Sequence, residues 1–137
     1  MTTSDQSTKT VSNFFEALGK GDSDAAINLF DEQAQIILVR PSENRDAEDL
    51  YGTYTGKKGA AGFLSNFSKT FSPQEFSVQN LIGNDQVAFA NGNFTHKVIA
   101  TGKLFSSNWA LMCIVKNEKI SEYRFYEDSS AFDAANS

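Results

Sequence analysis

The apolar residues nearest the N-terminus recur at helical spacing. They are Val11, Phe14, Phe15 and Leu18. Intervals of three and four residues place these side chains on one face, which predicts an amphipathic helix. Gly19 and Gly21 end this helix, and Asp22 or Ser23 caps a second, short helix over residues 25–30.

The middle of the chain alternates between apolar runs and polar segments. Residues 36–39 are apolar and predict a strand, whereas the polar, glycine-containing residues 42–55 predict a loop. A third helix is predicted over residues 57–70, with Thr55 as its cap. Its inward face carries Phe63, Leu64 and Phe67.

Strand-like runs separated by turn residues occupy the C-terminal half. The runs are 76–82, 86–98, 104–116 and 119–127. The breaks Gly-Asn-Asp, Thr-Gly-Lys and Asn-Glu favour tight turns, so the four runs predict an antiparallel meander. Long antiparallel strands tend to curl. We therefore predict an α+β fold in which the N-terminal helices pack in the concave face of a strongly curved, mainly antiparallel sheet, leaving a cone with an open mouth.

Length and composition fit one domain over residues 1–137, because 40% of the 137 residues are hydrophobic. We expect the polar residues 1–8 to be flexible. The net charge is −5 and no cluster of Lys and Arg appears, which argues against a nucleic-acid partner. No apolar run approaches the roughly 20 residues that span a bilayer, and the N-terminus lacks the hydrophobic region of a signal peptide. We therefore expect a cytoplasmic protein with no membrane partner.

The chain offers little for a metal or a cofactor. One histidine and one cysteine, Cys113, do not supply the ligands of a usual zinc site. Cys113 lies in an apolar run and is typical of a small buried residue. The segment Gly56-Lys57-Lys58-Gly59 is too short for a nucleotide-binding loop. We expect neither a metal nor a cofactor.

The last predicted strand carries an unusual set of polar residues. Arg124, Tyr126 and Asp128 are spaced by two, so a strand points all three to one face. That face is either exposed to water or lines a cavity that requires charge. In a cavity, Asp128 is the candidate acid/base group, and Arg124 and Tyr126 are candidates to stabilise an oxygen. Alternatively, Asp128 caps a helix, and Arg124 forms a structural ion pair with Asp128 or Glu122. A tight pair with Asp128 lowers the pKa of this carboxyl group and makes it a poor base.

Other residues are also candidates for a site. His96 titrates near neutral pH and is the fourth catalytic candidate. The ligand-binding candidates are Trp109, Tyr54, Tyr51, Phe63 and Phe94. The alternatives are that His96 is structural, that Trp109 fills the core and that both tyrosines belong to a solvated loop.

Four stretches of the chain resemble a known family. They are V-S-N-F-F-E-A-L-G-K-G-D at 11–22, Y-T-G-K-K-G-A-A-G-F-L at 54–64, G-N-F-T-H with A-T-G-K within 92–103, and K-I-S-E-Y-R-F-Y-E-D-S-S-A-F at 119–132, together with Trp109. Through them the chain is similar to SnoaL-like proteins, which include polyketide cyclases and ketosteroid-isomerase-related proteins of the nuclear transport factor 2-like superfamily. The resemblance implies the cystatin-like cone of that superfamily and spans nearly the whole chain.

The resemblance also implies roles for two residues. Asp128 lies where SnoaL-type cyclases place an acid/base aspartate, and His96 resembles the histidine of their T-H…T-G stretch. True ketosteroid isomerases carry a basic carboxylate just before a proline that follows the first strand. This chain has Val39-Arg40-Pro41 there, so we reject steroid isomerase as the activity.

We therefore expect a SnoaL-like protein that binds a small, mostly apolar molecule. An enzymatic version would perform cofactor-free acid/base chemistry, of isomerase, cyclase or hydratase type, on an apolar carbonyl compound. The alternative is a non-catalytic ligand-binding or structural dimer module, and a cavity plugged by Phe and Trp favours the structural one. We also expect a homodimer formed through the convex face of the sheet, because soluble monomers rarely expose a large apolar patch.

Overall fold

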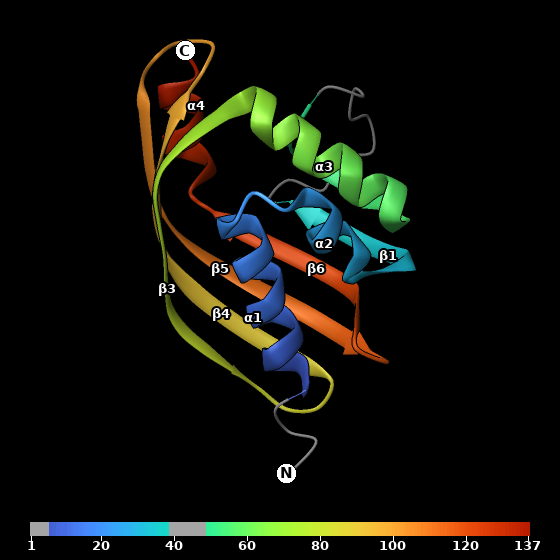
Figure 1. Cartoon of the computed structure of the whole chain (residues 1–137). Helices are drawn as coiled ribbons and strands as arrows, with labels where there is room; N and C mark the ends of the chain where they lie inside the picture. The colour runs from blue at the N-terminus through green and yellow to red at the C-terminus, as the bar shows by residue number, and fades with distance from the viewer. Residues whose placement is uncertain (1–5, 39–48) are drawn as a thin grey trace.

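The computed structural model describes residues 6–38 and 49–137, which form four helices and one six-stranded sheet (Figure 1). The helices are α1 (Gln6–Gly19), α2 (Ser23–Asn28), α3 (Gly56–Thr70) and α4 (Ser129–Ala135). The strands are β1 (Phe30–Leu38), β2 (Gly52–Thr55), β3 (Phe71–Gly83), β4 (Val87–Val98), β5 (Leu104–Lys116) and β6 (Lys119–Glu127). Within these residues, no helix is long and apolar enough to cross a membrane.

The sheet has six strands in the order β2-β1-β6-β5-β4-β3. Strands β3 to β6 form the predicted antiparallel meander, while β1 pairs parallel with β6 and antiparallel with β2. The sheet curves around α1, α2 and α3, which lie on its concave side (Figure 1). The predicted α+β cone is therefore confirmed. The short helix α4 packs against β5 and covers one end of the cone.

The first strand is longer than its apolar run indicates. β1 begins at Phe30, so the prediction that the second helix extends to residue 30 is wrong. The polar residues 31–33 belong to the strand and conceal its alternation in the sequence. Its inward side chains are buried, and they are those of Phe30, Ala34, Ile36 and Leu38.

Three other boundaries follow from local chemistry. Asp22 is the cap of α2, because its Oδ1 accepts a hydrogen bond from the Ala25 N–H at 3.1 Å. The end of the predicted loop, Gly52–Thr55, forms β2 at one edge of the sheet. At the other edge, β3 begins at Phe71 and passes through Pro73, which an edge strand tolerates because its outer side needs no N–H donor.

The predicted stripe of α1 packs against the sheet. Phe14 is fully buried, and its ring meets those of Phe30 and Tyr123 edge-on with centroid distances of 5.5 Å. The helix begins at Gln6, inside the segment predicted to be flexible. Ser7 is buried there, and its hydroxyl donates to the carbonyl oxygen of Asn84, in the turn between β3 and β4, with the carbonyl oxygen of Val87 as a second acceptor at 3.1 Å.

Side chains along β4 and β5 alternate between a buried concave face and an exposed convex face. Gly92 lies on the concave face, opposite a bulge in β3. A β-carbon at this position would lie 1.8 Å from the carbonyl oxygen of Ser77 and 2.9 Å from the ring of Trp109. Glycine therefore lets the β3 backbone and the indole ring approach β4 closely.

Candidate functional site

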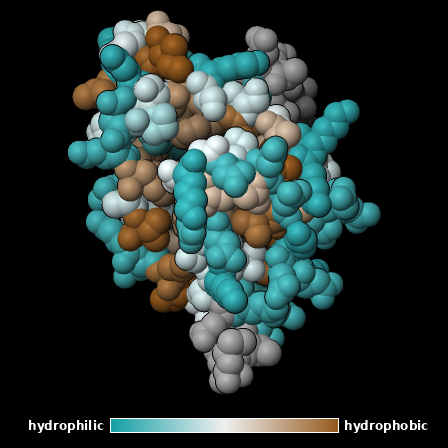
Figure 2. Space-filling model, viewed as in Figure 1, coloured by the Kyte–Doolittle hydropathy of each residue, from teal (hydrophilic) through white to brown (hydrophobic). Residues whose placement is uncertain are grey.

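The concave face of the sheet and the helices that cover it bound a cavity of about 810 Å³. Aromatic rings dominate its wall, and they belong to Phe15, Tyr51, Phe63, Phe67, Phe71, Phe76, Phe94, Tyr123 and Phe125. Leu18, Phe76 and Val78 line the cavity and are partly exposed, so they form an apolar rim between α1 and β3. Figure 2 shows apolar side chains gathered over β3 beside α1 on this face of the molecule.

Stacked rings support one wall of the cavity. Trp109 lies between Phe76 and Phe125, with centroid distances of 5.0 Å and 5.5 Å and nearly parallel planes. Its indole N–H donates to the carbonyl oxygen of Ser77 at 3.2 Å. Phe15 of α1 packs against both Trp109 and Phe76. Trp109, the only tryptophan of the chain, is therefore in direct contact with rings that line the cavity.

His96 is the polar group within this wall. It lies on the inward face of β4, is 3% exposed and lines the cavity. Its ring stacks on Phe94 at 4.1 Å, and Phe67 meets it edge-on at 5.3 Å. The Nδ1 atom is buried and forms no hydrogen bond within the part of the chain that the structure describes.

Burial also sets the charge of this imidazole. Desolvation lowers the pKa of His96 from 6.5 to about 4, although the backbone of Thr95 opposes part of that shift. The ring is therefore neutral at physiological pH. A neutral imidazole has one nitrogen that donates a hydrogen bond and one that accepts.

A carboxylate and a phenol form a second polar group in the cavity. Glu127 is the last residue of β6 and points inward, and the Tyr51 hydroxyl donates to its Oε2 at 2.6 Å. The Tyr51 ring packs edge-on against Phe132 of α4 at 4.9 Å, and Phe132 in turn contacts Phe71, which lies beside His96. Contacts through these rings thus link both polar groups to α4.

Tyr123 adds a third hydroxyl to the lining. Tyr123 lies on the same inward face of β6 as Glu127, with Phe125 between them on that face. Burial raises the pKa of its phenol well above the ordinary value, and Cys113 and Glu127 raise it further. Tyr123 therefore stays neutral and serves the cavity as a hydrogen-bonding group only.

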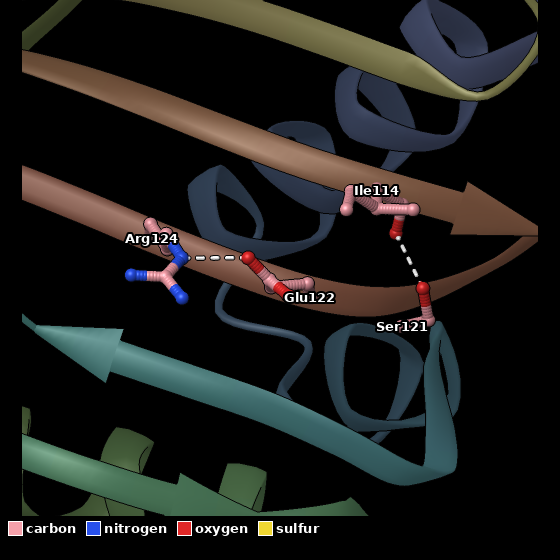
Figure 3. Close-up of polar contacts among 4 residues, drawn as sticks. All are labelled: Ile114, Ser121, Glu122 and Arg124. Carbon is pink, nitrogen blue, oxygen red and sulfur yellow. Dashed lines mark hydrogen bonds and ion pairs between the residues drawn. The ribbon is translucent and has the colours of Figure 1, made fainter.

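The structure separates three of the four predicted catalytic residues from this cavity. Because Tyr123, Phe125 and Glu127 face inward, alternation places Arg124 and Tyr126 on the convex face. Arg124 Nε donates to Glu122 Oε2 at 2.6 Å along β6 (Figure 3). The figure also shows the Ser121 hydroxyl bonded to the carbonyl of Ile114 on the neighbouring strand.

Asp128 has the structural role that the sequence left open as an alternative. It is exposed, and its Oδ1 accepts a hydrogen bond from the Ala131 N–H at 3.0 Å, which caps α4. The expectation that Asp128, Arg124 and Tyr126 line one cavity is therefore wrong. Arg124, Tyr126 and Asp128 lie on the side of the sheet that is exposed to water. Of the four predicted catalytic residues, only His96 lines the cavity.

The predicted ligand-binding residues divide in a similar way. Tyr51, Phe63 and Phe94 line the cavity, whereas Trp109 lies behind the lining rings. Tyr54 is buried outside the lining, and its hydroxyl donates to the Leu50 carbonyl at 2.8 Å and accepts from Asn66 Nδ2 at 3.0 Å. The solvated-loop alternative for the two tyrosines is thus wrong.

Glu127 was missed by sequence reasoning, although a signal was present. It alternates with Tyr123 and Phe125, two large rings typical of a buried face. Its partner Tyr51 is 76 residues away in the chain, and no spacing predicts that contact. Cys113 is buried, as predicted, and burial raises its pKa, so its thiol is unreactive. Across residues 6–38 and 49–137, no group of three or more His, Cys, Asp or Glu side chains is placed to hold a metal.

Comparisons with known proteins agree with this architecture. The sequence profile of the SnoaL-like domain matches residues 11–123. An NTF2-like protein from Burkholderia xenovorans LB400 superposes with a TM-score of 0.84 at 22% identity over 98% of both chains. No curated protein sequence matches the chain.

Two further solved structures with the same fold carry functional descriptions. A candidate isomerase from Bacillus subtilis has a TM-score of 0.80 at 18% identity, over 100% of this chain and 98% of its own. A candidate polyketide cyclase from Xanthomonas campestris pv. campestris has a TM-score of 0.80 at 16% identity, over 99% of this chain and 100% of its own. At such identities the likeness shows a shared fold.

Proposed function

The chain belongs to the family of SnoaL-like domains, and from this premise we propose that it binds a small, mostly apolar molecule in the cavity of the cone. The cavity itself carries the proposal. Its volume of about 810 Å³ is in the range of small-molecule sites, and its wall is aromatic with a few polar groups. A structural module would fill this space with side chains, because protein interiors are close-packed.

Binding can be tested with N-phenyl-1-naphthylamine, a neutral dye that fluoresces in apolar sites. We expect a saturable rise in dye fluorescence and a change in the emission of Trp109. Phe76→Ala removes a ring from the rim of the cavity and should weaken binding by about tenfold, the size of one aromatic contact.

The matched control is Phe89→Ala. Phe89 is 52% exposed and Phe76 is 45% exposed, but Phe89 lies on the convex face of β4. This variant should bind the dye as the wild type does. Equal losses in the two variants, or the absence of saturable binding, would contradict a site in the cavity.

A second candidate function is cofactor-free proton transfer next to the carbonyl group of an apolar compound. The observation that favours it is the Tyr51–Glu127 hydrogen bond inside an aromatic cavity. The Glu127 carboxylate, held by Tyr51, can accept a proton from carbon, and the phenol of Tyr123 in the same lining can donate a hydrogen bond to the developing charge. The solved Bacillus and Xanthomonas structures of the same fold are described as a candidate isomerase and a candidate polyketide cyclase, and isomerisation and cyclisation are reactions that such a proton transfer can serve.

Glu127 and Asp128 are adjacent carboxylates, but only Glu127 lines the cavity, and this difference allows a direct test of the proton transfer. The probe is 2-tetralone, whose α-protons exchange with D2O at a rate that NMR measures. Glu127→Gln should lose about a hundredfold or more of any acceleration, which is the usual contribution of a general base, whereas Asp128→Asn should keep it. Exchange no faster than in buffer would leave ligand binding as the function.

We propose, in addition, that the protein is a homodimer through the convex face of its sheet. This face exposes large apolar side chains, among them Ile82 and Phe89, which pair directly across β3 and β4, and Leu104 and Tyr126 on β5 and β6. Exposed apolar side chains of this kind favour association. Sedimentation equilibrium should give a dimer for the wild type and a weaker one for Phe89→Asp, and a monomeric wild type would contradict the proposal.

A further inference from the structure

We propose that His96 holds the hydroxyl group of the ligand, so that the cavity selects a neutral ring compound carrying a hydroxyl, such as a phenol or a ring-bound alcohol. This inference rests on the proposed ligand-binding function and names the chemical class of the ligand. Four features of the site support it: an unpaired buried nitrogen of His96, the neutrality of the His96 ring, the charges of the cavity lining and the aromatic rings that flank His96.

The first feature is the unpaired Nδ1 atom of the imidazole. His96 is 97% removed from solvent, since it is 3% exposed, yet its Nδ1 has no hydrogen-bond partner among the described residues. Buried polar groups in folded proteins are nearly always paired, and an exception requires an explanation. His96 belongs to the lining of the cavity, so we assign the missing partner to a ligand bound there.

The second feature is the neutrality of the ring. Burial lowers the pKa of His96 to about 4, so one nitrogen donates and the other accepts at neutral pH. A hydroxyl both donates and accepts, and it therefore satisfies either nitrogen. An ether or a carbonyl can only accept, and a methyl group does neither.

The third feature is the charge of the lining. Its charged side chains, within the described residues, are those of Asp22 and Glu127, and both are acidic. Neither Lys nor Arg lines this part of the cavity to balance an anionic ligand. A carboxylate or phosphate in an apolar cavity without a cation would be desolvated at high cost. The ligand that fits is neutral.

The fourth feature is the shape around the imidazole. Phe94 stacks on His96 with an interplanar angle of 11°, while Phe67 stands perpendicular to it at 88°. Phe71 closes another side at 5.0 Å. These rings leave flat, apolar surfaces around a single polar group, and aromatic pairs favour stacked or edge-to-face contacts. The ring of such a ligand matches the flat aromatic surfaces, and its single hydroxyl matches the imidazole of His96.

The experiment uses three naphthalenes that differ in one substituent. The ligands are 1-naphthol, 1-methoxynaphthalene and 1-methylnaphthalene, and the readout is the dissociation constant from calorimetry at neutral pH. In the wild type, 1-naphthol should bind more tightly than 1-methoxynaphthalene. In His96→Phe, the ratio of 1-naphthol affinity to 1-methylnaphthalene affinity should fall by about tenfold, the usual size of one hydrogen bond.

A hydroxyl on the other face of the sheet gives the matched control. Tyr126→Phe removes a phenolic oxygen from the convex face and should leave the affinity ratio unchanged. An unchanged ratio in His96→Phe would overturn the inference. Equal binding of 1-methoxynaphthalene and 1-naphthol to the wild type would overturn the hydroxyl class, because an acceptor alone would then suffice.

A measurement on the wild type removes any dependence on how the variant folds. His96 is the only histidine of the chain, so its two ring nitrogens give an isolated signal in long-range ¹H–¹⁵N NMR spectra. Addition of 1-naphthol should shift a ring nitrogen, and 1-methylnaphthalene should not. Binding of all three naphthalenes without such a shift overturns the role of His96 alone, whereas binding of none of them contradicts the proposed function itself.

Discussion

The two faces of the sheet are built from the same strands and differ in burial and in the contacts of their side chains. On the concave face, β4 and β5 present buried side chains that include Phe94, His96, Phe105 and Trp109. On the convex face the same strands present exposed side chains, some large and apolar, such as Phe89 and Leu104, and others small and polar, which bond to their neighbours across the strands. These pairs are Ser77–Asn93, Asn80–Asn91 and Thr95–Ser106, each at 2.9 Å.

The difference between the faces shows that a shift of one residue along a strand decides whether a side chain lies in the cavity or on the convex face. Side chains of a strand alternate with a period of two, so neighbours in sequence lie on opposite faces. On β6 this rule sends Glu127 into the cavity and Tyr126 toward solvent. Polar residues spaced by two mark a common face, but the spacing alone does not say which face it is.

The largest expected effect comes from truncating neighbours on opposite faces of β5. Phe105 is 1% exposed and packs against Phe71, Phe94 and Phe132, so Phe105→Ala should lower the free energy of unfolding by about 3–5 kcal/mol. Leu104 is 63% exposed, and Leu104→Ala should change it by less than about 0.5 kcal/mol. Urea unfolding followed by Trp109 fluorescence measures both. Similar losses would break the contrast between the faces.

The next effect concerns the close approach at Gly92. The β-carbon in Gly92→Ala would lie 1.8 Å from a backbone oxygen, so β3 must move, and we expect a loss of about 1–3 kcal/mol. Gly19→Ala is the control, because nothing lies within 4 Å of a β-carbon there and the loss should be negligible. Urea unfolding compares the two variants. A stable Gly92→Ala protein would mean that the bulge in β3 adapts freely.

The meander was predictable because its turns are explicit in the sequence. Residues such as Gly83-Asn84-Asp85 end one apolar run before the next begins, and the turns of the meander lie at these breaks. The start of β3 was predicted wrongly, because the strand begins at Phe71 and not at Phe76. β1 was harder, because the polar residues 31–33 interrupt its alternation. Local patterns therefore determine the elements well wherever turn residues separate them.

The candidate site was less predictable, because its groups meet only after the chain has folded. The pairing of Tyr51 with Glu127 depends on how β2 and β6 are placed around β1. The missing partner of His96 depends on Phe67, Phe71 and Phe94, which come from three elements. No spacing in the sequence encodes burial of this kind.

The concave face should also give the protein a specific dependence on pH. His96 has a folded-state pKa of about 4 and an ordinary value of 6.5, so the unfolded chain binds the proton first as the pH falls. Its neutral form stabilises the fold fully above about pH 7, and this stability declines between about pH 6.5 and 4. The loss should reach about 2 kcal/mol at pH 5.

His96→Phe separates this effect from the titration of the carboxylates. Urea unfolding of the wild type and the variant at about pH 7.5 and pH 5 gives the difference that belongs to His96. The variant should lose about 2 kcal/mol less than the wild type between these two conditions. If both lose the same amount, the imidazole is not buried in its neutral form.

The smallest effect separates the cap of α4 from the chemistry of the cavity. Asp128→Ala removes the oxygen that accepts the Ala131 N–H, and it should cost about 1 kcal/mol in urea unfolding. Asp128→Asn keeps a capping oxygen and should lie close to the wild type, because Asn and Asp are comparable caps. Neither change should alter the affinity for N-phenyl-1-naphthylamine, since Asp128 lies outside the lining. If Asp128→Asn folded normally but lost ligand binding or proton exchange, Asp128 would reach the ligand after all, and the division of the two faces would not decide function.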